Sequence, residues 1–143
     1  MIFFDTFENR VAAWANLRKE IETHDDPLNH ALRFWNRAPI ANMTCDPFDR
    51  STWPLAWDLI DENRYCDFSK MLALSYTFSL TDRFSNEPHK ICITTDRKEH
   101  QMLYLLHLDD QVLGYRYDSA MHKDELPPHL IVQASYTMTA DQS

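Results

Sequence analysis

The chain has 143 residues, of which 44% are hydrophobic and 25% charged, and these ordinary values indicate a single domain spanning residues 1–143. Its formal net charge of -8 argues against a nucleic-acid partner, because the phosphate backbones of DNA and RNA are themselves negative. No apolar run reaches the roughly 18 residues of a membrane-spanning helix, so we expect no membrane partner.

One composition value restricts the function further. Gly114 is the only glycine, whereas the P-loop and the dinucleotide-binding loop need glycines where the backbone approaches a phosphate. Nucleotide hydrolysis by a P-loop and hydride transfer on a Rossmann domain are therefore excluded, and we expect no cofactor. The three cysteines are an odd number without close spacing, which suits a reducing, intracellular compartment.

Residues 1–50 are expected to form the N-terminal helices and a loop. Apolar residues from Phe7 to Ile21 recur at helical spacing after Asp5 and Thr6, either of which can cap the helix. Pro27 can open a second, shorter helix, because proline is tolerated in a first helical turn. Turn-forming residues between 38 and 50 predict an ordered loop.

We expect residues 51–85 to form the core helical segment. Ser51 or Thr52 can cap a short helix with Pro54 in its first turn, and Asp67 can cap a longer helix over residues 68–84. Apolar side chains cover most of the circumference of this longer helix, which predicts that it is buried.

From residue 89 the pattern changes to short β-rich segments separated by polar turns, which predicts an antiparallel meander over residues 89–138. The expected strands comprise residues 90–95, 100–108, 112–118 and 130–138. Helices followed by strands indicate an α+β fold, in which N-terminal helices and a buried central helix pack on a C-terminal antiparallel four-stranded sheet.

Cys66 lies beside the expected start of the central helix, where the helix dipole can increase the acidity of a thiol. Strands carrying His100 and His107, and then Asp118, follow it along the chain. This order of cysteine helix, histidine strand and acidic strand resembles the transglutaminase-like and papain-like cysteine fold over residues 54–118. The resemblance implies a small cysteine hydrolase or acyltransferase with Cys66 as the nucleophile, a strand histidine as the base and Asp118 as the acidic member.

An inert role for Cys66 is the alternative. His100 and His107 are seven residues apart, so on a regular strand they point to opposite faces and at most one can approach Cys66. The setting Tyr-Cys-Asp-Phe differs from the Gly-x-Cys-Trp-like setting common in that family, and the charge of Asp67 disfavours a thiolate. Cys66 would then be a small core residue. No close pair of ligands has the spacing of a zinc site, so we expect no metal.

The tryptophans suggest a binding surface. Trp14, Trp35 and Trp53 are many for a small domain, and exposed tryptophans tend to anchor protein interfaces. We expect at least one of the three to be substantially exposed in the isolated chain.

The run DPFDRSTWPLAWDLIDENRYC at residues 46–66 resembles a block in small proteins of large contractile-tailed, marine-type bacteriophages, which typically reads Trp-Pro-x-x-Trp-Glu-Leu-Ile followed by Tyr-Cys. Residues 74–84 and 104–115 are also similar, with Asp58 and the pair Leu55–Ala56 as mild departures. That family supplies a biological setting and no mechanism.

The missing catalytic motifs, the acidic charge and the phage-like block together predict a non-enzymatic bacteriophage protein that binds other proteins, as a minor virion component or an assembly factor. Its partners would be phage structural proteins. It would reside in the host cytoplasm during infection or in the virion, and its oligomeric state stays open. The cysteine hydrolase or acyltransferase is the alternative function.

Overall fold

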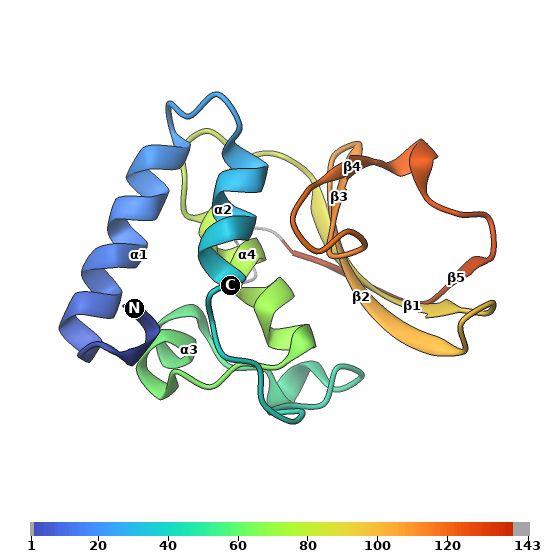
Figure 1. Ribbon diagram of the computed structural model, residues 1–143, viewed down its shortest axis with the longest axis horizontal. Coiled ribbons are helices and arrows are strands. Elements are labelled where there is room, and N and C mark those ends of the chain that lie inside the picture. Colours follow the sequence, from blue (N-terminus) through green and yellow to red (C-terminus); the bar gives the residue numbers. More distant parts are fainter. Residues whose placement is uncertain (1, 139–143) are drawn as a thin grey trace.

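The computed structural model describes residues 2–138 and has an α+β fold, as the sequence predicts. Figure 1 shows the helices gathered on one side of the molecule and the sheet on the other. The elements in chain order are η1 (Ile2–Phe4), α1 (Phe7–Ile21), α2 (Pro27–Trp35), η2 (Arg50–Thr52), α3 (Ala56–Glu62), α4 (Asp67–Ser79), β1 (His89–Asp96), β2 (Gln101–Leu108), β3 (Gln111–Leu113), β4 (Met121–His122), η3 (Lys123–Glu125) and β5 (Leu130–Thr137).

Helix α4 is the central buried element. It contacts α1, α2 and α3 on the helical side and β1 and β2 of the sheet. Apart from Asp67 and Lys70, every residue of α4 is buried. The prediction of a buried central helix is therefore confirmed. A helix that is apolar nearly all round removes its side chains from water only when other elements cover it on every side.

A buried hydroxyl joins three helices. The indole nitrogens of Trp14 in α1 and Trp35 in α2 both donate to Oγ1 of Thr77 in α4, at 2.9 and 3.0 Å. Thr77 in turn donates to the carbonyl oxygen of Ala73, at 2.7 Å. A hydroxyl offers one donor and two acceptor lone pairs, so all of its hydrogen-bonding capacity is used.

The sheet has five strands in the order β4-β3-β2-β1-β5, with every neighbouring pair antiparallel. Strands β1 to β4 follow one another as the expected meander, and β5 then crosses to the free edge of β1. The sequence predicts four strands rather than five because β4 contains only two residues, too few to show an alternating pattern.

The third strand ends at Leu113, five residues earlier than the sequence predicts. Gly114 follows with φ +105°, a backbone conformation that favours glycine. A Cβ at this position would lie 2.7 Å from the carbonyl oxygen of Tyr104 and 3.0 Å from the sulfur of Met71. The only glycine of the chain therefore allows the backbone to turn while it lies directly against both β2 and α4.

Three predicted helix boundaries differ from the structure. Helix α3 starts at Ala56 without a side-chain cap, and Ser51 and Thr52 belong to η2. Helix α4 is capped by Cys66 rather than Asp67, and it ends at Ser79 instead of residue 84. These shifts arise because capping depends on local backbone geometry, which residue type alone does not determine. No helix described between residues 2 and 138 is long and apolar enough to span a membrane.

The burial of α4 predicts unequal effects of truncating Leu72, inside the helix, and Leu80, just beyond its end. Leu72→Ala should lower the free energy of unfolding by about 2–5 kcal/mol, because Leu72 is fully buried. Leu80→Ala should lower it by less than about 1 kcal/mol, because Leu80 follows the helix and is 42% exposed. Urea denaturation measures both values. Equal effects for the two variants would contradict the central position of α4.

Thr77 provides a second stability prediction. Thr77→Val preserves the side-chain shape but leaves two buried indole N–H groups without an acceptor, which should lower the free energy of unfolding by about 2–6 kcal/mol. Thr77→Ser keeps the hydroxyl and should lower it by only about 1 kcal/mol, the value of one buried methyl group. Chemical denaturation would compare them. A Val variant as stable as the Ser variant would show that the indole bonds contribute little.

Candidate functional site

Cys66 caps helix α4 with its thiol. The backbone N–H of Ser69 donates to Cys66 Sγ at 3.4 Å, and the backbone N–H of Cys66 donates to Ser69 Oγ at 2.8 Å. These reciprocal bonds form a capping box in which sulfur takes the place of the usual hydroxyl or carboxylate oxygen. The sulfur therefore lies at the positive end of the helix dipole.

The loop between α2 and η2 covers this helix end. Its residue Ile40 forms a parallel bridge with Tyr65, and the Ala41 N–H donates to the Tyr65 carbonyl oxygen at 2.8 Å. Further along the loop, Thr44 Oγ1 lies 3.3 Å from Cys66 Sγ. The loop residue that follows, Cys45, is therefore near Cys66 although 21 positions separate the two in the sequence.

Hydrogen bonds make Cys66 the more acidic thiol of the pair. The neighbouring Cys45 thiol, followed by hydrogen bonds with Thr44 and Ser69, holds the pKa of Cys66 well below its ordinary value although burial opposes the shift. The pKa of Cys45 is raised by the neighbouring Cys66 sulfur and by burial. The arrangement favours a thiolate on Cys66 and a protonated thiol on Cys45.

The β2 residue that approaches the first turn of α4 is a tyrosine. The Tyr104 ring packs edge-on against the Phe68 ring, with 5.4 Å between the centroids. Burial, together with the negative charges of Cys66 and Asp67, raises the pKa of Tyr104. A tyrosine with a raised pKa stays protonated at neutral pH, so it does not supply the base that a nucleophilic cysteine requires.

His107 lies on the other face of the sheet. Its neighbours Leu106 and Leu108 belong to the core that contains α4, so the side chain between them points the opposite way. There it pairs across the ladder with Lys90. Burial, followed by the charges of Lys90 and Lys123, lowers the pKa of its imidazole. The expected role of His107 as a base for Cys66 does not fit this position.

The other two expected catalytic residues are exposed and lie outside the strands. His100 occupies the turn between β1 and β2 with φ 54°, four residues before Tyr104 in the sequence. Asp118 lies in the loop that follows β3. Among residues 2–138, the hydrogen-bond partners of the Cys66 sulfur are the Thr44 hydroxyl and the Ser69 backbone N–H, so the thiol has neither a histidine nor an acidic partner.

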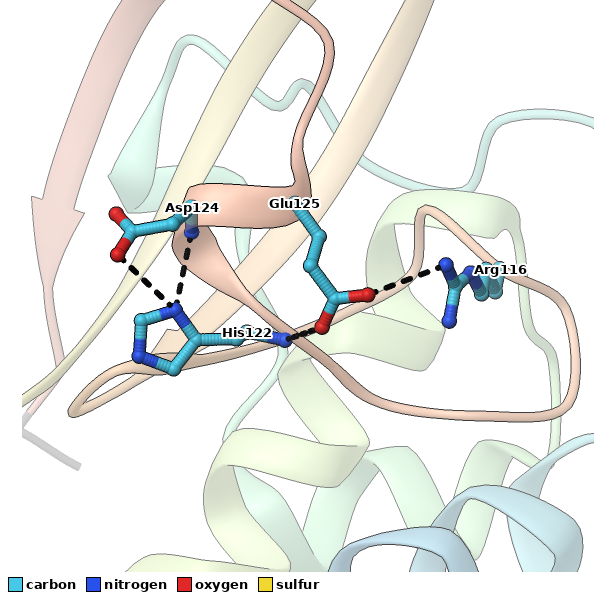
Figure 2. A network of polar contacts seen from close by, with 4 residues as sticks. All are labelled: Arg116, His122, Asp124 and Glu125. Atoms are coloured by element: carbon cyan, nitrogen blue, oxygen red, sulfur yellow. Dashed lines mark hydrogen bonds and ion pairs between the residues drawn. The ribbon is translucent and has the colours of Figure 1, made fainter.

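A polar network anchors the loop that carries Asp118 (Figure 2). Arg116 contacts Glu125 at 3.4 Å, and Glu125 accepts the backbone N–H of His122 at 3.0 Å. His122 Nδ1 accepts the backbone N–H of Asp124 at 3.2 Å. These bonds cap η3 and attach the preceding loop to it, which is a structural role.

A cavity of about 250 Å³ lies between α4 and the loop after β3. Its charged and aromatic walls include Asp67, Lys70, Tyr104, Arg116 and Tyr117. Cys66 does not line it, so a ligand in this cavity would meet those side chains rather than the thiol. Across residues 2–138, no group of three or more His, Cys, Asp or Glu side chains is placed to hold a metal ion.

The tryptophans expected to bind partners lie mostly inside. Trp14 and Trp35 are fully buried, with their indole nitrogens donating to Thr77, so neither side chain is available on the surface. Trp53 is partly buried against Phe68, and its indole N–H donates to the Asp46 carbonyl oxygen. The exposed tryptophan is Trp57, with 51% of its surface accessible.

No protein-family model matches the chain, and no curated protein matches it either. Among solved structures, calcium-bound LapG from Legionella pneumophila is similar, with a TM-score of 0.68 over 92% of this chain and 78% of that chain. The two share a fold. LapG has the transglutaminase-like fold, and the sequence identity is 15%. The topological resemblance drawn from the order of cysteine helix and later strands is therefore supported at the level of fold.

Sequence reasoning missed Thr44 and Cys45 as neighbours of Cys66. They belong to a loop whose path depends on its pairing with Tyr65, and no local spacing pattern records such a contact. It also missed Tyr104, the β2 residue that packs against Phe68 in the first turn of α4. The alternation of side chains along β2 could have revealed it, because Tyr104 points to the same face as Leu106 and Leu108, and the residues between them point to the other face.

The burial of Cys66 predicts slow alkylation in the folded protein. Although the pKa of the thiol is lowered, only 2% of the residue is exposed, so iodoacetamide at pH 6 should react with it far more slowly than after unfolding in urea. Residue-resolved mass spectrometry measures the rate. His100→Ala and His107→Ala should change it by less than about twofold. Rapid alkylation that either substitution abolishes would establish a functional Cys–His pair.

Proposed function

We propose that this chain is a non-catalytic, protein-binding member of the transglutaminase-like fold. The observation that carries the proposal is the environment of Cys66, where β2 presents Tyr104 to the first turn of α4 and where the thiol serves as a helix cap. A domain of this fold without a base beside its cysteine retains a rigid scaffold and loses the proton transfer that nucleophilic catalysis requires.

The binding surface of this proposal is the α1–α3 face, which we define by four exposed apolar residues: Phe4, Phe7, Leu55 and Trp57. The Trp57 ring packs edge-on against Trp14, 5.0 Å between centroids, and the Arg18 guanidinium lies over it at 5.6 Å. Phe7 lies two helical turns before Trp14 on the same side of α1. A rigidly held, half-exposed aromatic ring is the usual anchor of a protein interface.

The charge of the chain indicates the kind of partner. With a net charge of -8, the protein would be attracted to a partner surface that is apolar at its centre and basic at its rim. The resemblance of residues 46–66 to proteins of contractile-tailed bacteriophages gives this partner a setting. We therefore propose a phage structural protein as the partner, with the chain acting as a minor virion component or an assembly factor in the infected host.

Phage carrying Trp57→Ala in this chain test the proposal. We expect loss of the chain from purified particles, if it is a virion component, or a several-fold fall in particle yield, if it is an assembly factor, because the central anchor of the interface is removed. Mass spectrometry of particles and plaque counts measure the two readouts. Val132→Ala is the matched control, because Val132 is equally exposed but lies on β5 in the other layer.

Particle composition and yield that are unchanged in Trp57→Ala, with the variant still folded, would contradict the proposed surface. If deletion of the whole chain also left both unchanged, the phage assignment itself would be overturned.

A cysteine hydrolase or acyltransferase is the second candidate, and two observations favour it. Cys66 lies at the N-terminus of a helix with a lowered thiol pKa, and LapG, which shares the fold, is a cysteine protease. For this function a base would have to reach the sulfur after the 38–50 loop moves. Covalent trapping of Cys66 as a thioester by an activated ester or peptide substrate, absent in Cys66→Ser, would favour this candidate over the first.

A further inference from the structure

The cavity between α4 and the loop after β3 plays no part in the proposed function, and its walls combine two kinds of side chain. The apolar walls are Leu32, Met71, Met102 and Leu103. The charged and aromatic walls include Lys70, Arg116 and Tyr117. An apolar pocket with a few polar groups is the usual form of a small-molecule site. The volume of about 250 Å³ is below the roughly 300 Å³ at which pockets for drug-sized ligands begin, so the ligand would be small.

Lys70 places a half-buried ammonium at the wall of this cavity. Its Nζ donates to Asn36 Oδ1 at 2.8 Å and lies 5.4 Å from the centre of the Tyr117 ring. An ammonium has three donors, so this one hydrogen bond leaves others for a ligand. The ion pairs formed by residues 2–138 do not include Lys70, although Asp67 is only three positions earlier on α4. Lys70 is therefore a partly desolvated cation without a carboxylate partner.

The polar side of the cavity is held in place by the protein itself. Asn36, which follows α2, donates through Nδ2 to the Tyr117 carbonyl oxygen at 2.7 Å, while its Oδ1 accepts from Lys70. One amide thus ties the loop after β3 to the lysine on α4. Glu125 holds Arg116 through a single guanidinium nitrogen at 3.4 Å (Figure 2), and a guanidinium has five N–H donors. A ligand would meet donors whose positions are already fixed, which lowers the entropic cost of binding.

We propose that this cavity binds a small monocarboxylate with an apolar or aromatic body. The Lys70 ammonium would bind the carboxylate, Arg116 would supply a second donor, and the apolar walls would receive the body. The charge of the ligand follows from the pairing of the wall cations. Arg116 already contacts a carboxylate and Lys70 does not, so the site balances one negative charge. A carboxylate carries that charge, whereas a phosphate monoester carries about 1.5 to 2 at neutral pH.

The test compares phenylacetate with its neutral amide, phenylacetamide, on the folded, full-length protein. Proton–nitrogen correlation NMR reports binding at the cavity directly, because Gly114 lines it and gives the only glycine signal of the chain. We expect phenylacetate to shift this signal and to bind at least about fivefold more tightly than the amide, since a hydrogen bond to a charged group is the stronger one. The net charge of -8 disfavours non-specific uptake of the anion.

Two variants connect the preference to the lysine. Lys70→Met keeps an unbranched apolar side chain without the ammonium and should remove the preference for the acid over the amide. Lys19→Met is the matched control, because Lys19 is an exposed lysine on α1 outside the cavity, and it should leave both affinities unchanged. N-acetylphenylalanine separates two sources of the same chemistry. Binding tighter than that of phenylacetate would assign the site to the C-terminus of a peptide, and weaker binding would assign it to a free acid.

Three results would each overturn the proposal: equal affinities for the acid and the amide, a Gly114 signal unmoved by up to about 10 mM phenylacetate, or a preference for the acid that persists in Lys70→Met. The comparison of acid with amide on the wild-type protein decides the question even if Lys70→Met fails to fold. None of these measurements involves the α1–α3 face, so this proposal and the proposed function can fail independently.

Discussion

The helical layer depends on the hydroxyl of Thr77. Two tryptophans from α1 and α2 converge on this single oxygen, and each buries a large ring that would otherwise carry an unsatisfied N–H into the core. Apolar packing alone tolerates sliding of one helix against another, whereas two bonds to one oxygen determine where both helices meet α4. The position of α1 also determines the position of α3, because the Arg10 guanidinium donates to the carbonyl oxygens of Ile60 and Asp61.

Each end of α4 has a buried, hydrogen-bonded polar side chain, but the two side chains differ in acidity. At its C-terminus the Ser79 hydroxyl donates to the Ser75 carbonyl oxygen and lies 2.9 Å from Nε2 of His89, whose pKa is lowered by burial. That histidine is held neutral and serves packing. At the N-terminus the polar atom is the sulfur of Cys66, which accepts the backbone N–H of Ser69 and has a lowered pKa. The imidazole of His89 and the acidic thiol of Cys66 thus lie at opposite ends of α4.

Local patterns predicted the elements well and their assembly poorly. Helical spacing and the Thr6 cap predicted α1 correctly, since both signals lie within one or two turns of chain. The burial of Trp14 and Trp35 could not be predicted, because a tryptophan fits either a core or an interface. The clue was the hydroxyl of Thr77 among the buried residues of α4. The site was hardest of all. The contact between Thr44 and Cys66 depends on the path of a loop, and the opposite orientations of Tyr104 and His107 depend on which face of β2 the helix covers.

Gly114 limits which amino-acid substitutions this protein can accept in evolution. Because the backbone there lies against both Tyr104 and Met71, the separation of the two layers at the mouth of the cavity is determined by the absence of a side chain. Any substitution would have to force helix and sheet apart or unwind the turn, and the left-handed conformation would strain every other residue type. Mutational tolerance should therefore be very uneven in this loop: the exposed side chain of Asp118 is free to vary, while Gly114 at the start of the loop is not.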